Sequence, residues 1–358
     1  MVYYPDMFRK LISHGGLLAL LLLASGSTTA QETDAEWDAW EEALTEEAES
    51  SGFNDAPLKE EVETPDWFRL TFLDLAEDLA DAKQSGREGL IVYFGQKHCP
   101  YCQALMEDLK QPDIRRYTQF NFDVVEVDIH GDRTVTDLEG NELTEKNFAE
   151  REKANLTPSL IFYDFEGLQA HKLTGYHGPY RFRAALEYVA GDHYKNESFR
   201  SYLKRADPNL TPREGELNKA GFFTSPPFNL DRTRFPGERP LIVFFEQADC
   251  HACDVLHTGP MRRPAIRDLI DQFDNVQLGI WDDTPVITPD GKRLTAREWS
   301  EQLQLFYTPT LLFFGSNGEE ILRLDSVAHF YRIKGILQYV LSGAHENGVT
   351  LQEWHRNR

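Results

Sequence analysis

Two short runs of consecutive apolar residues stand out along the chain, at residues 90–94 (LIVYF) and 241–245 (LIVFF). Neither run leaves a polar face, which is typical of a strand buried on both sides. A cysteine pair and a segment with helical spacing follow each run. An alternating apolar segment at residues 122–127 then predicts a second strand. The pattern predicts an α/β unit that occurs twice.

A shift of 151 residues superimposes the two units without gaps. It places Phe94 on Phe245, Gln96 on Gln247, and Thr157-Pro158 on Thr308-Pro309, and it also aligns Tyr180-Arg181 with Tyr331-Arg332. Matches sustained over about a hundred residues indicate a tandem duplication of one domain type.

The remaining elements can be predicted once and applied twice. Helices are expected at 100–109, after Thr144 and Thr295, and at 180–189 and 331–341; strands are expected at 160–163 and 311–314. Thr295 with Glu298 forms a capping-box pattern. The predicted fold class is α/β, with two tandem domains that each have a mixed central sheet flanked by helices. A helix at 68–82 is expected only before the first unit, because prolines interrupt the corresponding region of the second.

The ends of the chain suggest export. Arg9 and Lys10 precede an apolar core at residues 17–24, and small residues end at Ala30, as in a cleavable signal peptide. We therefore expect a periplasmic or otherwise exported protein, soluble and without stable membrane insertion after cleavage. The 358 residues divide into a signal peptide (1–30), an acidic lead (31–65), domain 1 (66–195), a connector (196–235), domain 2 (236–345) and a tail (346–358).

Acidic residues dominate the charge balance. The net charge is −22, and residues 31–66 hold fourteen Asp and Glu against one Lys. Nucleic-acid binding requires basic surface that displaces counterions from phosphates. Nucleic acid is therefore excluded as an expected partner.

The four cysteines form two Cys-x-x-Cys pairs, Cys99 with Cys102 and Cys250 with Cys253. A ring closed over two residues removes little unfolded-state entropy, so such pairs suit electron exchange better than structural crosslinking. The first cysteine of each pair lies where a helix begins, and there the helix dipole favours a thiolate. That thiolate attacks a disulfide and the second cysteine resolves the mixed disulfide.

Together, the apolar strand, the Cys-x-x-Cys and a proline 59 residues after the first cysteine resemble the thioredoxin fold, most closely periplasmic thioredoxin-like proteins of the SoxW type. The resemblance implies that Pro158 and Pro309 are cis and face the cysteines, and that Thr157 and Thr308 pair with an extended substrate. It implies a thiol-disulfide oxidoreductase that is more reductive than oxidative. Its partners are then exported proteins with thiols or disulfides and an upstream redox partner protein.

The two centres differ in their flanking residues. The buried carboxylate that thioredoxins often carry six residues before the first cysteine is absent, because Tyr93 and Phe244 occupy that position. Lys97 and His98 precede Cys99, whereas Asp249 precedes Cys250 and His251 follows it. Positive neighbours favour the thiolate. The hypothesis is that Cys99 is the more acidic thiol, and that electrons pass from the second pair to the first.

Two alternatives remain open from the sequence. Cysteine pairs also bind zinc, although zinc-binding pairs usually lie closer together in sequence. The second alternative is a non-enzymatic thioredoxin-fold adaptor or chaperone whose cysteine pairs are vestigial. No metal site and no cofactor is expected, since no phosphate loop or dinucleotide fingerprint follows a strand. Reductase, oxidase and isomerase directions are not distinguished.

Overall fold

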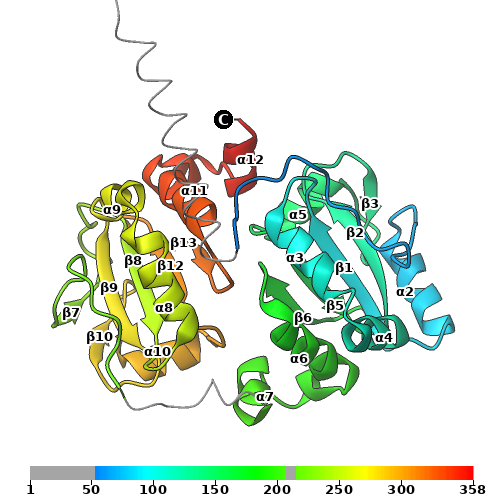
Figure 1. Ribbon diagram of the computed structural model, residues 1–358, viewed down its shortest axis with the longest axis horizontal. Coiled ribbons are helices and arrows are strands. Elements are labelled where there is room, and N and C mark those ends of the chain that lie inside the picture. Colours follow the sequence, from blue (N-terminus) through cyan, green and yellow to red (C-terminus); the bar gives the residue numbers. More distant parts are fainter. Residues whose placement is uncertain (1–52, 207–214, 358) are drawn as a thin grey trace, which may run out of the picture. The chain divides into compact units, whose positions relative to one another are not determined.

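The computed structural model describes residues 53–206 and 215–357, all within one compact unit that begins at Phe53. The expected signal peptide and most of the acidic lead lie outside the described residues. Figure 1 shows two successive α/β domains. We call the elements from α2 to α7 the first domain and those from β7 to α12 the second domain.

The first domain follows the predicted order with two added helices. Its elements are α2 (Leu75–Gln84), β1 (Gly89–Gly95), α3 (Pro100–Asp108), α4 (Pro112–Asn121), β2 (Phe122–Asp128), β3 (Thr134–Thr136), β4 (Glu142–Thr144), α5 (Glu145–Arg151), β5 (Ser159–Tyr163), β6 (Gln169–Thr174), α6 (Gly178–Ala190) and α7 (Phe199–Ala206). The short 3₁₀ helix η1 (His193–Lys195) links α6 to α7.

After its first strand, the second domain repeats the order that follows α2 in the first domain. Its elements are β7 (Phe228–Asn229), β8 (Leu241–Glu246), α8 (His251–Thr258), η3 (Pro260–Arg262), α9 (Pro264–Ile270), β9 (Asp274–Gly279), β10 (Pro285–Ile287), β11 (Arg293–Thr295), α10 (Ala296–Gln302), β12 (Thr310–Phe314), β13 (Glu320–Leu324), α11 (Phe330–Leu341), η4 (Ala344–Asn347) and α12 (Leu351–Arg356). The predicted capping box of Thr295 and Glu298 begins α10.

Both main sheets are mixed, as expected. Their strand orders are β2-β1-β5-β6 and β9-β8-β12-β13. In each, the strand before the cysteines pairs parallel with one neighbour and antiparallel with the other. The duplication therefore extends to strand order and direction.

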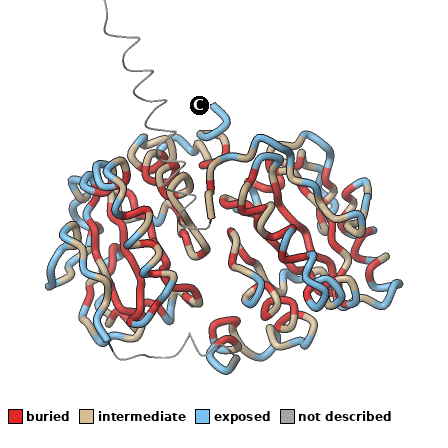
Figure 2. Tube along the Cα trace, viewed as in Figure 1, coloured by how far each residue is buried: buried red, intermediate tan, exposed pale blue. Residues whose placement is uncertain are grey.

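The apolar strand of each domain supplies two cores. Ile91 and Tyr93 of β1 pack with α3, α4 and α6, whereas Val92 and Phe94 point to the opposite face and pack with α2 and α5. All residues of β1 and β8 are buried, and the tube along these strands is red in Figure 2. This two-sided burial explains why the strands have no alternating polar residues.

The prediction of a helix at residues 68–82 is wrong at its start. Helix α2 begins at Leu75, and the side chain of Asp74 caps it by accepting from the backbone N–H groups of Ala76 and Glu77. The preceding segment is extended instead, and Arg69 N donates to Val124 O at the edge of the sheet. A capping aspartate outweighs the apolar pattern upstream of it.

The second domain has no helix equivalent to α2 among its described residues. Aromatic residues of the connector pack onto the domain instead. Phe222 and Phe223 cover one core and Phe228 covers the other.

The two domains contact each other through equivalent segments. The backbone N–H of Val327 donates to Tyr176 O at 2.8 Å, and a Cβ on Gly175 would lie 2.1 Å from Ser326 Oγ. The 151-residue shift maps Gly175 on Ser326 and Tyr176 on Val327. Equivalent residues facing each other are the signature of a two-fold interface, here within one chain.

The terminal helices of the two domains make matching crossings. Arg200 of α7 donates to Leu305 O in the second domain, and Gln352 of α12 donates to Ala154 O in the first. The same shift maps Ala154 on Leu305. Segments expected as connector and tail therefore contain helices that join the domains, and each crossing ends next to a Thr-Pro loop.

Candidate active sites

The first centre lies at the start of α3. Cys99 is the N-cap residue, its Sγ accepts a hydrogen bond from Cys102 N at 2.9 Å, and Pro100 occupies the first turn. Cys99 and Cys102 form a disulfide, and both are almost completely buried. After reduction, the donor that now faces Cys99 Sγ would stabilise a thiolate there.

The second centre repeats this geometry at the start of α8. Cys250 is the N-cap residue and accepts from Cys253 N at 3.1 Å, and the two cysteines form a disulfide. His251, at the position of Pro100, is exposed. The pattern of a strand, a capping cysteine and a helix therefore fixes both pairs in the same way.

The two Thr-Pro sequences lie against the cysteines, and both peptide bonds are cis, as the resemblance implied. Thr157 Oγ1 lies 3.3 Å from Cys99 Sγ. Thr308 Oγ1 and O lie 3.6 and 3.7 Å from Cys250 Sγ. Pro158 and Pro309 are therefore in place beside the centres.

The flanking charged residues predicted to tune the thiols all lie on the surface. Lys97 is exposed and pairs with Glu61 at 3.0 Å, and this hydrogen bond raises the pKa of Lys97. His98 is exposed, with Nδ1 3.3 Å from Glu60 O. Asp249 and His251 are exposed beside Cys250, and Asp249 adopts a left-handed backbone with φ of 50°. Their influence on the thiols stays a prediction.

The sequence interpretation missed a glutamine that connects the two sides of the first centre. Gln96 Nε2 donates to Thr157 Oγ1 at 3.1 Å, and its Oε1 lies 3.0 Å from His130 Nε2. The equivalent Gln247 accepts from Trp281 Nε1 at 2.9 Å. The sequence signal that could have identified both glutamines is their alignment under the 151-residue shift.

A buried carboxylate was also missed. Tyr93 and Phe244 do occupy the expected position, but Glu246 lies two residues further along β8 and is fully buried. Its Oε1 is 2.8 Å from His257 Nε2, and its Oε2 accepts from Gln277 Nε2 at 2.9 Å. His257 lies four residues after Cys253, on the same helical face. The sequence signal that could have identified this carboxylate is an acidic residue at the end of an otherwise apolar strand.

In the first domain, a phenol occupies the corresponding space. Gly95 is the equivalent of Glu246, and a Cβ on it would lie 2.3 Å from Tyr93 Oη. Burial raises the pKa of Tyr93. The first centre therefore has a neutral buried group where the second has a carboxylate and a histidine.

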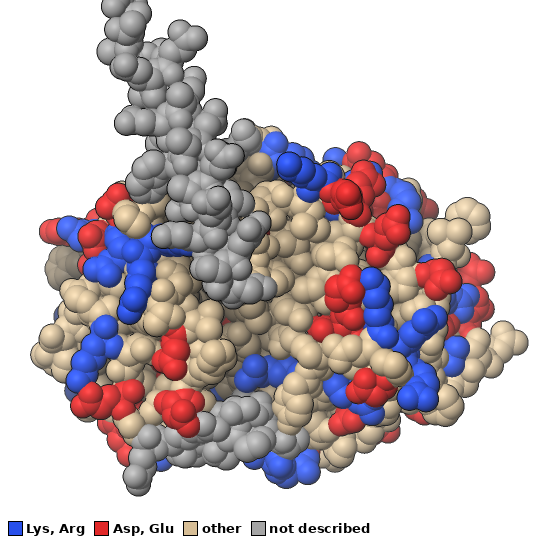
Figure 3. All heavy atoms as spheres, in the orientation of Figure 1, with Lys and Arg blue, Asp and Glu red and all other residues tan. Residues whose placement is uncertain are grey.

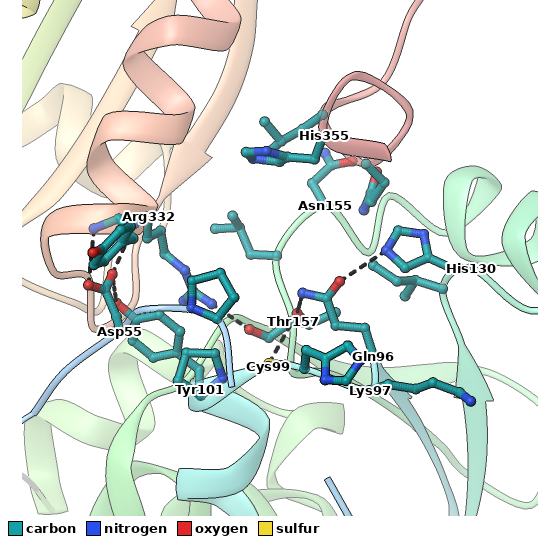
Figure 4. Close-up of a pocket in the computed structure, with 18 of the residues that line it drawn as sticks. Asp55, Gln96, Lys97, Cys99, Tyr101, His130, Asn155, Thr157, Arg332 and His355 are labelled. Carbon is teal, nitrogen blue, oxygen red and sulfur yellow. Dashed lines mark hydrogen bonds between the residues drawn. The ribbon is translucent and has the colours of Figure 1, made fainter. Parts of the chain in front are cut away.

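The first centre is also covered by other parts of the chain, drawn in Figure 4. Tyr101 Oη donates to Asp55 at 2.9 Å and accepts from His329 N at 2.8 Å. The guanidinium of Arg332 stacks on the Tyr101 ring, 3.5 Å from its centroid, and donates to Thr157 O at 2.5 Å. Beside them lies a pocket of about 530 Å³ whose lining includes Cys99, Arg332 and residues of α12.

The comparisons agree with this geometry. The profile of the thioredoxin-like domain matches residues 75–190 and 230–341. These two regions make up more than half of the chain, so the protein belongs to the thioredoxin-like domain family, with two copies of the domain. No curated protein matches the chain.

Solved structures with similarity to this chain include single-domain proteins. A thioredoxin-fold protein from Helicobacter pylori is 22% identical, with a TM-score of 0.33, over 41% of this chain and 94% of that one. A thioredoxin from Thermus thermophilus is 28% identical, with a TM-score of 0.26, over 32% and 83%. The oxidised C-terminal domain of DsbD from Neisseria meningitidis is 14% identical, with a TM-score of 0.24, over 29% and 81%.

Two further observations concern metals and membranes. Within residues 53–206 and 215–357, no group of three or more His, Cys, Asp or Glu side chains is arranged to hold a metal ion. None of the described helices has the length and apolar character that a membrane span needs. On the face of the molecule in Figure 3, basic and acidic side chains are intermixed.

Proposed function

We propose that this protein is an exported thiol-disulfide oxidoreductase that exchanges disulfides with protein substrates, predominantly in the reductive direction. The observation that carries the proposal is the threonine before each cis proline, which lies 3.3–3.7 Å from the sulfur of the capping cysteine. A substrate chain that pairs with this threonine presents its disulfide to that sulfur. The signal-like residues 1–30 support export, and the family resemblance supports the reductive direction.

The chemistry needs only the cysteines. The thiolate of the reduced capping cysteine attacks one substrate sulfur, the substrate S–S bond breaks, and a mixed disulfide forms. The second cysteine, deprotonated, then attacks the sulfur of the first, and the substrate leaves with both sulfurs reduced. Two electrons and two protons have moved to the substrate. An upstream redox partner protein must reduce the resulting Cys99–Cys102 or Cys250–Cys253 disulfide again.

Insulin reduction, with dithiothreitol as electron donor, tests the proposal. The intact chain should reduce insulin disulfides, the C99S/C102S and C250S/C253S variants should each retain one centre, and the variant lacking all four cysteines should be inactive. An adaptor without catalytic use of its cysteines predicts instead that the intact chain and the four-cysteine variant behave alike.

Reduction potentials test the direction. Values near −270 mV, like that of thioredoxin, support a reductant, whereas values near −120 mV indicate an oxidant. Export is tested separately, by expressing the chain with its own N-terminus and determining whether the exported form begins after Ala30.

A further inference from the structure

The two centres differ in how open they are to an extended polypeptide. At the first centre, Tyr101 between the cysteines is 3% exposed and Cys99 is 1% exposed. At the second, the equivalent residues are Ala252, which is partly exposed, and Cys250, which is 7% exposed, and the adjoining His251 is exposed. The first centre is therefore the more enclosed of the two.

The covering of the first centre comes from two directions. The segment after Phe53 runs along it, and the backbone N–H groups of Leu58 and Val62 donate to the carbonyls of His98 and Lys97. The N-terminal end of α11 approaches from the second domain. Asp55 joins these two, because its carboxylate accepts from Tyr101 Oη and from the backbone N–H groups of Tyr331 and Arg332.

Arg332 binds the backbone carbonyl with which an extended substrate chain would pair. An extended chain that adds to the edge of a protein segment does so through backbone carbonyl and N–H groups. The carbonyl of Thr157, beside the cysteines, already accepts from Arg332 Nη2 at 2.5 Å. Because the guanidinium is also stacked on Tyr101 and hydrogen-bonded to Val327 O, several contacts must break before a chain can dock.

We propose that Arg332 is a specificity-determining residue. It reserves the first centre for disulfides small enough to enter the adjacent pocket of about 530 Å³, and thereby leaves exchange with extended polypeptides to the second centre. That volume lies in the range of small-molecule sites. The proposal rests on the proposed thiol-disulfide exchange and assigns a substrate class to each of its centres.

The chain contains a matched control for Arg332. Arg181 is its equivalent under the 151-residue shift and stacks on Tyr307, 4.7 Å from the ring centroid, beside the second centre. Since His251 is exposed with Arg181 in place, Arg181→Ala should not increase the reaction of the second centre with polypeptides.

The test compares each centre in isolation on two substrates, insulin and the small disulfide 5,5′-dithiobis(2-nitrobenzoate). In the C250S/C253S background, Arg332→Ala should raise the insulin rate about tenfold more than the small-disulfide rate, because only the polypeptide must displace Arg332 from Thr157 O; tenfold is the loss expected from one charged hydrogen bond. Asp55→Asn should act in the same direction. In the C99S/C102S background, Arg181→Ala should leave both rates within about twofold.

An unchanged insulin rate for Arg332→Ala overturns the proposal, and so does a parallel rise with both substrates. If a variant fails to fold, a trapping experiment that keeps Arg332 in place tests the proposal. Cys102→Ser and Cys253→Ser chains, which cannot resolve the mixed disulfide, are mixed with a disulfide-containing peptide. The mixed disulfide should form at least about tenfold faster at Cys250 than at Cys99, and equal rates contradict the proposal. If neither centre reacts with the small disulfide, the proposed function itself fails.

Discussion

The two domains share their fold, their capping cysteines and their cis prolines, yet the space between the active-site helix and the sheet is filled differently. In the first domain, Tyr93 extends its phenol over Gly95. In the second, Phe244 is apolar and Glu246 supplies a buried carboxylate held by His257 and Gln277. The two domains therefore share the geometry of the cysteines and cis prolines, whereas the residues beneath them differ in pairs: a large Tyr93 stands with Gly95, and an apolar Phe244 stands with Glu246.

The largest effect on stability is expected from a substitution that removes the buried contact between Glu246 and His257 in the second domain. His257→Met introduces the residue that the first domain has at the equivalent Met106, and it leaves Glu246 buried without its histidine. Leaving a buried carboxylate without one of its hydrogen-bond partners costs about 3 kcal/mol. We expect a loss of this size in the unfolding free energy of the second domain, measured by urea denaturation. The double variant Glu246→Gln/His257→Met should recover part of the loss; if it is no more stable than His257→Met, the pair is not coupled.

The converse substitution in the first domain should have a somewhat smaller effect. Gly95→Ala places a methyl group 2.3 Å from Tyr93 Oη, where it cannot fit without movement. Overpacking typically costs about 1–3 kcal/mol, and we expect a loss in this range for the unfolding free energy of the first domain. Tyr93→Phe/Gly95→Ala should be more stable than Gly95→Ala alone. Equal stabilities would show that the phenol does not occupy this space.

The sequence predicted the parts of the fold that depend on local pattern. Three local features recur at a fixed spacing: the continuous apolar strands, the capping threonines and the Thr-Pro loops. One set of predictions therefore applied to both domains. Tyr101 shows what the sequence could not predict. Its burial depends on Asp55, 46 residues earlier, and on His329, 228 residues later. Contacts between domains follow from how whole surfaces meet, which no short pattern encodes.

Helices α7 and α12 were missed for a related reason. They follow the predicted closing helices and lie in the segments expected as connector and tail. Their role is visible only in the crossings from Arg200 to Leu305 and from Gln352 to Ala154. Short helices gain most of their stability from tertiary packing rather than from propensity, so their sequences carry a weak signal.

Acidification should affect the domain interface through His177. This side chain is buried against Phe306 and Tyr307 of the second domain, and burial, with the nearby Arg181 cation, lowers its pKa to about 3. The folded state therefore binds fewer protons than the unfolded state between pH 6.5 and 3, and stability falls as the pH falls through this range. From pH 7 to pH 5 the unfolding free energy should decrease by about 2 kcal/mol on account of this residue.

Denaturation at both pH values checks the effect of His177. The second domain has Ala328 at the equivalent position, which cannot titrate. His177→Phe should remove about 2 kcal/mol of the pH dependence while keeping an aromatic ring against Phe306. An unchanged pH dependence in His177→Phe would show that the acid response comes from other groups.

The smallest expected effect concerns the exposed charges beside the cysteines. Lys97→Ala removes a positive charge before Cys99, and Asp249→Ala removes a negative one before Cys250. Because both side chains are exposed and screened, each should shift its cysteine's pKa by less than about one unit, upward for Cys99 and downward for Cys250. Thiolate absorbance at 240 nm, followed against pH in single-centre variants, measures both pKa values. Shifts in the same direction would contradict electrostatic tuning, and the predicted order of the two centres would then have to come from the buried residues Tyr93 and Glu246.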